Sequence, residues 1–94
     1  MNPMSTQKKI QEQHDVDTLE KKENQIVVYN DDVNTFDHVI DVLVAACDHT
    51  HIQAEQCSLI IHYKGKCTVK SGDYEDLVPR CSKLLEEGIS AEIV

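Results

Sequence analysis

Apolar and polar positions along residues 25–94 follow periods that switch between those of strands and those of helices. Short apolar or alternating runs occupy 25–29, 66–71 and 89–94, which predicts three strands. Between them, apolar residues recur every three or four positions, which predicts amphipathic helices. The predicted order is therefore strand, helix, helix, strand, helix, strand.

The helical spacing also predicts which side chains are buried. The three stripes are Phe36, Val39, Ile40, Leu43 and Cys47; then Ala54, Cys57, Ile60 and Ile61; and last Tyr74, Leu77, Val78, Cys81, Leu84 and Leu85. Pro79 lies about six residues into the third predicted helix, where a proline removes one backbone hydrogen bond. We expect a kink there or a later helix start.

Capping residues place the ends of the helices. Asn34 with Asp37 has the form of a capping box, so Asn34 is the expected N-cap of the first helix. Thr50 with Gln53 repeats this form before the second helix, and Gly65 supplies its left-handed end.

The third helix has similar signals. Asp73 is its expected N-cap, and Gly88 is expected to close it.

These elements predict one small α+β domain in which three helices pack on a three-stranded antiparallel sheet. Ninety-four residues leave no room for a second domain. Residues 1–23 lack apolar periodicity and cannot bury enough surface to offset their ordering entropy, so we expect a flexible N-terminal extension before a core domain at 24–94.

The charge narrows the choice of partners. The formal net charge is −8, and from Asn24 onward 12 acidic residues face 5 basic ones. Without a basic face, nucleic acid is an unsuitable partner, whereas a cationic ligand or a basic protein surface is favoured. No apolar run is long enough for a bilayer, and the N-terminus lacks the apolar core of a signal peptide, so a cytoplasmic location is expected.

Cys47, Cys57, Cys67 and Cys81 form no Cys-x-x-Cys pair, and three of them lie on apolar stripes. We expect buried, reduced thiols. A zinc site of Cys47 and Cys57 with His49 and His51 stays an alternative.

An enzyme that uses a Cys57 nucleophile and a His62 base is a weaker alternative. Five residues on a helix turn two side chains about 140° apart.

A polar loop that contains Asn30, Asp31, Asp32 and Asn34 joins the first strand to the first helix. Its side-chain oxygens suit two roles. They can turn and cap the backbone, or they can present several acceptors to a cation.

Three sequence pieces, taken in order, resemble the ClpS family. They are Asn-Asp-Asp at 30–32 after a strand, Asp-His-Val-Ile-Asp-Val-Leu at 37–43, and Ile-His-Tyr-Lys-Gly-Lys at 61–66. The resemblance covers residues 25–94. Members of this family are adaptors of the Clp AAA+ protease and recognise N-terminal degrons.

The resemblance implies a peptide-binding site. By position, Asn30, Asp32 and His62 would hold the free α-amino group, and His62 must be uncharged on one ring nitrogen to accept a hydrogen bond. Acidification is therefore expected to weaken binding. The full expected site is Asn30, Asp31, Asp32, Asn34, Phe36, Val39, Ser58, Ile61 and His62.

The apolar part of this site departs from the family pattern. Val39, Ser58 and Ile61 match the pocket wall, but Asn34-Thr35-Phe36 stands where Thr-Pro-Met is common, and Ser58 replaces a second pocket Met. We expect N-terminal Leu, Phe, Tyr or Trp to bind, with their ranking open.

The resemblance further implies a monomeric, non-enzymatic adaptor without a cofactor. It would hand substrates to the N-terminal domain of a ClpA-type or ClpC-type unfoldase, which would dock Glu75 and Arg80 on the third helix. The unfoldase would engage the N-terminal extension during delivery; an inert leader is the alternative for residues 1–23. The alternative is a module of the same fold that docks the unfoldase without recognising N-degrons.

Overall fold

The computed structural model describes residues 23–94, which form three helices and three strands. In chain order they are β1 Asn24–Tyr29, α2 Phe36–Cys47, α3 His51–Lys64, β2 Lys66–Gly72, α4 Tyr74–Glu86 and β3 Ala91–Ile93. This order confirms the predicted one. The prediction of a flexible extension at 1–23 lies, apart from Glu23, outside the described residues.

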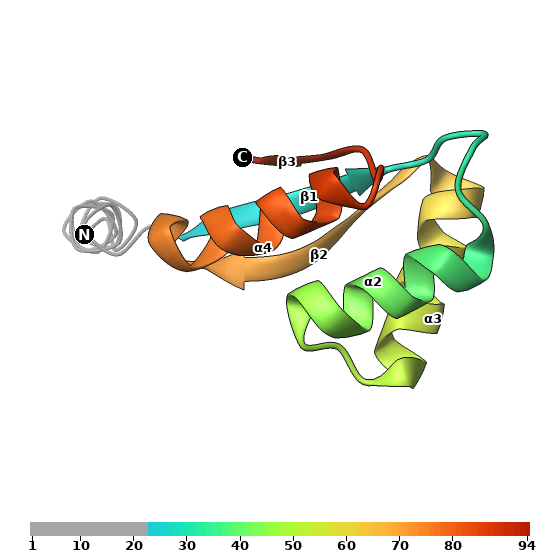
Figure 1. Cartoon of the computed structure of the whole chain (residues 1–94), viewed down its shortest axis with the longest axis horizontal. Helices are drawn as coiled ribbons and strands as arrows, with labels where there is room; N and C mark the ends of the chain where they lie inside the picture. Colours follow the sequence, from blue (N-terminus) through green and yellow to red (C-terminus); the bar gives the residue numbers. More distant parts are fainter. Residues whose placement is uncertain (1–22) are drawn as a thin grey trace, which may run out of the picture.

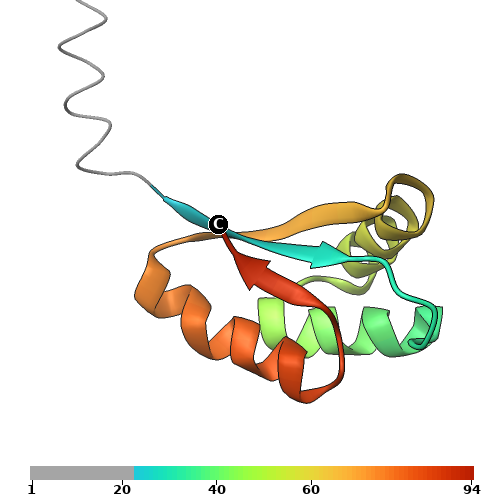
Figure 2. The same ribbon diagram turned by 90° about the horizontal axis from the view of Figure 1, so that it is seen from above.

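The sheet has β1 at its centre, between β2 and β3, and both pairings are antiparallel. Figure 2 shows the strands as one layer, with α2 and α4 on the same side of it. The remaining helix, α3, packs against α2 and β2. The predicted α+β architecture is thereby confirmed.

The buried side chains of the strands and of the helix stripes pack together in one core between the sheet and the helices. Ile26 and Val28 of β1 are nearly inaccessible to solvent, and Leu43, Leu77 and Leu84 are fully buried among the helices. Burial of each such side chain stabilises the fold by about 1.5–3 kcal/mol. The core therefore fixes α2 and α3 relative to the end of β1, where the polar loop begins.

The apolar stripes predicted to be buried on the three helices include residues that the structure leaves exposed. Several of their members are well exposed, with exposed fractions of 39 % for Phe36, 44 % for Ile60, 57 % for Tyr74, 38 % for Val78 and 54 % for Leu85. A helix that packs on one side buries only a narrow arc of its circumference, so the flanks of each stripe stay outside.

The N-cap of α2 is Thr35, and the prediction of Asn34 is wrong. Thr35 Oγ1 accepts a hydrogen bond from the backbone N–H of His38 at 3.1 Å, while the Asn34 side chain makes other contacts. Both residue types suit an N-cap, so sequence could not separate two neighbours.

Other helix ends follow the prediction. Thr50 and Gln53 form a capping box before α3, and Gly65 ends that helix with a φ of 96°. Asp73 is the N-cap residue of α4 but makes no side-chain capping bond. The Gly88 N–H donates to the Leu85 carbonyl just beyond the end of α4.

Pro79 lies inside α4, which begins at Tyr74, so the alternative of a later helix start is wrong.

Within residues 23–94, no helix combines the length and the apolar character that a membrane span requires.

All four cysteines are free thiols. Cys47 and Cys81 are buried as predicted, whereas Cys57 and Cys67 are half-buried. Burial raises the pKa of Cys47 to about 11 and that of Cys57 to about 12. At neutral pH both thiols are therefore protonated, which disfavours Cys57 as a nucleophile.

Candidate functional site

The nine residues predicted for the peptide site line one pocket of about 380 Å³. The loop after β1, the start of α2 and the C-terminal half of α3 form its walls. Figure 1 shows the loop running from β1 to α2 past the end of α3. The Asn30 N–H donates to the Gly65 carbonyl at 2.9 Å and holds these two segments together.

Asp31 braces the loop from within. Its Oδ1 accepts the backbone N–H groups of Val33 and Asn34, each at 2.9 Å, and its Oδ2 accepts the Asn34 side-chain amide at 2.7 Å. These hydrogen bonds, that from the Asn34 backbone first, lower the pKa of Asp31. Asp31 is thus a charged structural residue that shapes the loop.

Asn34 fastens the loop to a distant part of the chain. Besides binding Asp31, its side-chain amide donates to the Gly88 carbonyl at 2.9 Å, in the connection between α4 and β3. His38 makes a parallel link, since its Nε2 lies 2.9 Å from the Glu87 carbonyl oxygen. The loop is therefore held to the end of α3 through Asn30 and to the α4–β3 connection through Asn34, while His38 holds the first turn of α2 near the same connection.

The two residues that flank Asp31, Asn30 and Asp32, are exposed and line the pocket. His62 is also exposed there, in the last turn of α3, with its ring edge-on to that of Tyr63. The pocket mouth thus offers an amide oxygen, a carboxylate and an imidazole, a set of acceptors suited to a cationic N–H donor.

The inner wall is apolar apart from one hydroxyl. Ile61 is 5 % exposed, Val39 is half-buried, and Phe36 forms part of the lining at 39 % exposed. Ser58 is 3 % exposed, and its Oγ has no hydrogen-bond partner among residues 23–94. This wall suits an apolar side chain next to the acceptors at the mouth.

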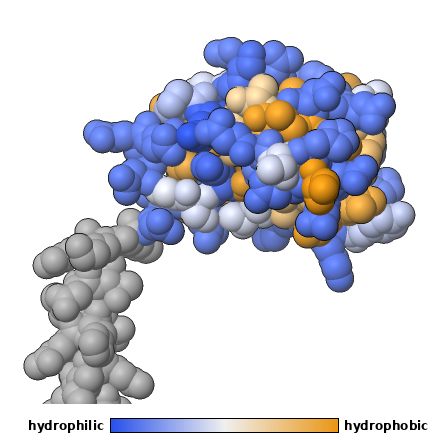
Figure 3. All heavy atoms as spheres, turned by 90° about the horizontal axis from the view of Figure 1, so that it is seen from below, coloured by the Kyte–Doolittle hydropathy of each residue, from blue (hydrophilic) through white to orange (hydrophobic). Residues whose placement is uncertain are grey.

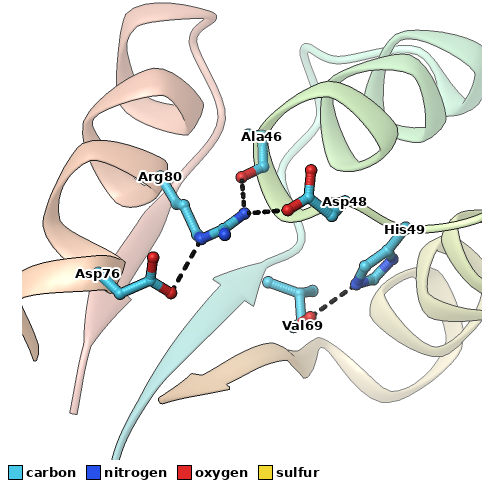
Figure 4. A network of polar contacts seen from close by, with 6 residues as sticks. All are labelled: Ala46, Asp48, His49, Val69, Asp76 and Arg80. Atoms are coloured by element: carbon cyan, nitrogen blue, oxygen red, sulfur yellow. Dashed lines mark hydrogen bonds and ion pairs between the residues drawn. The ribbon is translucent and has the colours of Figure 1, made fainter. Parts of the chain in front are cut away.

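Arg80, predicted to dock a partner, makes three internal contacts (Figure 4). Its Nη1 donates to Asp48 Oδ2 at 2.9 Å and to the Ala46 carbonyl at 3.1 Å, and its Nε donates to Asp76 Oδ2 at 3.2 Å. Arg80 thereby ties α4 to the C-terminus of α2. The last carbonyl groups of a helix have no N–H partner within the helix, and Arg80 is the donor to that of Ala46. Glu75, the other predicted docking residue, is exposed.

The zinc alternative is not assembled. His49 Nε2 instead lies 2.6 Å from the Val69 carbonyl oxygen, which links the turn after α2 to β2 (Figure 4). No three His, Cys, Asp or Glu side chains gather to hold a metal ion in the described part of the chain.

A second surface feature lies on the two helices of the pocket. Seen from below, apolar side chains emerge between polar ones on the side of the domain that carries α2 and α3 (Figure 3). Among the exposed apolar residues of the domain are Val44 of α2 and Ile52 and Leu59 of α3.

Sequence left two roles open for Asp31 and Asn34: to support the loop or to bind a ligand. Both residues line the pocket, and their polar side-chain atoms also bind the loop and the α4–β3 connection. An Asp followed by polar residues is a common turn signal, which indicated the supporting role of Asp31. The Asn34 contact with Gly88 joins residues 54 positions apart and has no local signal.

Comparison with known proteins identifies the family of this chain. The family model described as ATP-dependent Clp protease adaptor protein ClpS matches residues 19–91. A ClpS adapter of the ATP-dependent Clp protease from Acetivibrio thermocellus is 30 % identical over 89 residues, which covers 95 % of this chain and 88 % of that protein.

A solved structure is similar in fold. It is Agrobacterium tumefaciens ClpS2 bound to L-phenylalaninamide, with a TM-score of 0.62 and 16 % sequence identity over 79 % of this chain and 99 % of that one. On the strength of the family match and the Acetivibrio relative, this chain belongs to the ClpS family of adaptors of the ATP-dependent Clp protease.

Proposed function

We propose that this adaptor captures proteins by a free N-terminal residue with a bulky apolar side chain and delivers them to a Clp unfoldase. One observation carries the proposal: a single pocket joins three exposed acceptors to an apolar wall. The ligand in the similar ClpS2 structure, L-phenylalaninamide, has the matching chemistry, since it combines a free α-amine with an aromatic side chain.

The three acceptors would act on the amine. An α-ammonium group has three N–H donors, and Asn30, Asp32 and His62 each offer an acceptor at the pocket mouth. The Asp32 carboxylate also supplies the opposite charge, which strengthens a hydrogen bond relative to a neutral pair. An acetylated N-terminus has neither the charge nor the full set of donors.

The apolar wall would act on the first side chain. Val39 and Ile61 offer apolar surface next to the acceptors, and Phe36 lies with them in the lining. Removing apolar surface from water contributes about 25 cal/mol per Å², so N-terminal Leu, Phe, Tyr and Trp gain most. Small or charged first residues gain little or lose free energy.

The delivery step follows from the family. An adaptor of the Clp protease has a Clp AAA+ protein as its partner, and we propose the N-terminal domain of a ClpA-type or ClpC-type unfoldase in the cytoplasm. Exposed Glu75 on α4 lies outside the peptide pocket, so an unfoldase that docks there would leave the pocket free for the substrate. The chain itself carries out no chemistry in this scheme.

Replacement of Asp32 tests the amine contact. Because Asp32 is exposed, Asp32→Ala should leave the fold intact and weaken binding of a free-amine Phe peptide at least tenfold, the loss of a charge-assisted hydrogen bond. Fluorescence anisotropy of a labelled peptide measures this, with circular dichroism as the check on folding.

Asp41→Ala is the matched control, since Asp41 is an exposed aspartate of α2 that does not line the pocket. It should bind as the parent chain does. Full affinity in a folded Asp32→Ala variant would contradict the proposed site.

A further inference from the structure

Ser58 stands out among the buried side chains. It is the one polar residue in the buried set of residues 23–94, at 3 % exposed, and its hydroxyl has no hydrogen-bond partner there. Buried polar atoms are nearly always paired, because an unpaired one has lost its bonds to water without replacement. The Ser58 Oγ is itself covered in the free chain. Ser58 nevertheless lines the peptide pocket, so a first side chain that fills the pocket packs against this residue.

The position of Ser58 on α3 sets its distance from the amine acceptors. Ser58 precedes His62 by four residues, or about 6 Å along the helix axis. Both line the same pocket, with apolar Ile61 between them in sequence. A first side chain whose backbone amine lies beside His62 must therefore extend about one helical turn to come level with the Ser58 hydroxyl.

We propose that Ser58 makes this pocket prefer N-terminal tyrosine to N-terminal phenylalanine. The inference rests on the proposed function. A phenol has the reach of an aromatic ring and carries at its tip a hydroxyl that both donates and accepts. Tyrosine would give the Ser58 Oγ a hydrogen-bond partner, whereas phenylalanine would leave it unpaired, as it is in the free chain.

The surroundings of Ser58 strengthen this preference. Val39 and Ile61 offer no hydrogen-bonding side-chain atoms, so the hydroxyl is the only polar side-chain group of the described inner wall. A phenol placed elsewhere along that wall would lose its own bonds to water. The preference arises because only the ligand with a hydroxyl supplies the partner that Ser58 lacks in the free chain.

Three peptides that differ only in the first residue test the proposal on the full chain. The residues are Phe, Tyr and 4-methylphenylalanine, which matches Tyr in size but lacks a hydroxyl. We expect Tyr to bind about three- to tenfold more tightly than either of the others, the range of one net hydrogen bond. Fluorescence anisotropy of labelled peptides gives the ratios.

Ser58→Ala removes the hydroxyl with little change of size. In this variant the advantage of Tyr over 4-methylphenylalanine should disappear. Ser82→Ala, a matched change at an exposed serine of α4 outside the pocket, should keep the Tyr preference. Thermal unfolding should show Ser58→Ala to be no less stable than the parent, because the hydroxyl is unpaired in the free protein.

The outcomes separate the two proposals. If free-amine Phe and Tyr peptides bind equally, or if 4-methylphenylalanine binds as tightly as Tyr, the role of Ser58 is overturned and the adaptor function stands. If Ser58→Ala keeps the full preference for Tyr, the role is likewise overturned. If no free-amine peptide binds to the folded chain, both proposals fail.

Discussion

At the scale of single residues, the two neighbouring aspartates of the loop have different tasks. Asp31 is half-buried and accepts three hydrogen bonds from the loop, whereas Asp32 is exposed and lines the pocket. The same residue type therefore supports the backbone at one position and is available to a ligand at the next. Sequence could list both as acceptors but could not divide these tasks between them.

The brace at Asp31 predicts a dependence of stability on pH. Its pKa is lowered in the folded chain, so its contribution is present above the ordinary aspartate pKa and is lost as the pH falls through the lower, folded value. Asp31→Asn should be less stable than the parent by about 1 kcal/mol at pH 7. The introduced side chain replaces one carboxylate oxygen with an NH₂ group, which cannot accept the hydrogen bonds that this oxygen accepts in the parent.

Urea unfolding of the parent and of Asp31→Asn between pH 7 and the acid range measures this difference. The free energies of unfolding should converge as the pH falls below the ordinary aspartate range, since the other carboxyl groups titrate in both chains. Two curves that stay parallel would show that the carboxylate does not brace the loop.

At the scale of elements, contacts between helix ends hold the pocket walls in place. Arg80 of α4 donates to Ala46 and Asp48 at the end of α2, and the start of α2 lies in the pocket. The Arg80 side chain is 21 % exposed, so its contact with the end of α2 is partly shielded from water. Arg80 therefore has an internal role, whichever surface the unfoldase contacts.

Arg80→Met tests that internal role. Exposed ion pairs contribute little, but a charged donor on a helical carbonyl contributes more, so we expect a loss of about 2 kcal/mol in the free energy of unfolding. Lys83→Met is the control, because Lys83 forms an exposed pair with Glu87 on the same helix; it should change stability by less than about 0.5 kcal/mol.

Unfoldase binding by the same variants separates two explanations. If Arg80→Met keeps the parent's stability but loses affinity for the unfoldase, Arg80 acts mainly in docking and not as a tie between α4 and α2.

At the scale of the whole molecule, periodicity predicted the element order and the sheet type, and the resemblance to the ClpS family supplied the residues expected at the peptide site. Periodicity located the elements, and the matching pieces at 30–32 and 61–66 brought the two halves of the pocket together. Local patterns could not show which stripe members stay exposed, because the exposure of residues such as Tyr74 and Leu85 is set by the packing of α4 in the closed fold. Nor could they show the Asn34 contact with Gly88, which only the closed fold creates.

The central claim is that the pocket recognises a free α-amine together with an apolar side chain. The most direct test compares two labelled peptides that begin with Phe and differ only in acetylation of the N-terminus, by fluorescence anisotropy with the full chain. We predict that the free-amine peptide binds and that acetylation abolishes binding. Equal binding of both peptides, or binding of neither by the folded chain, would contradict the account.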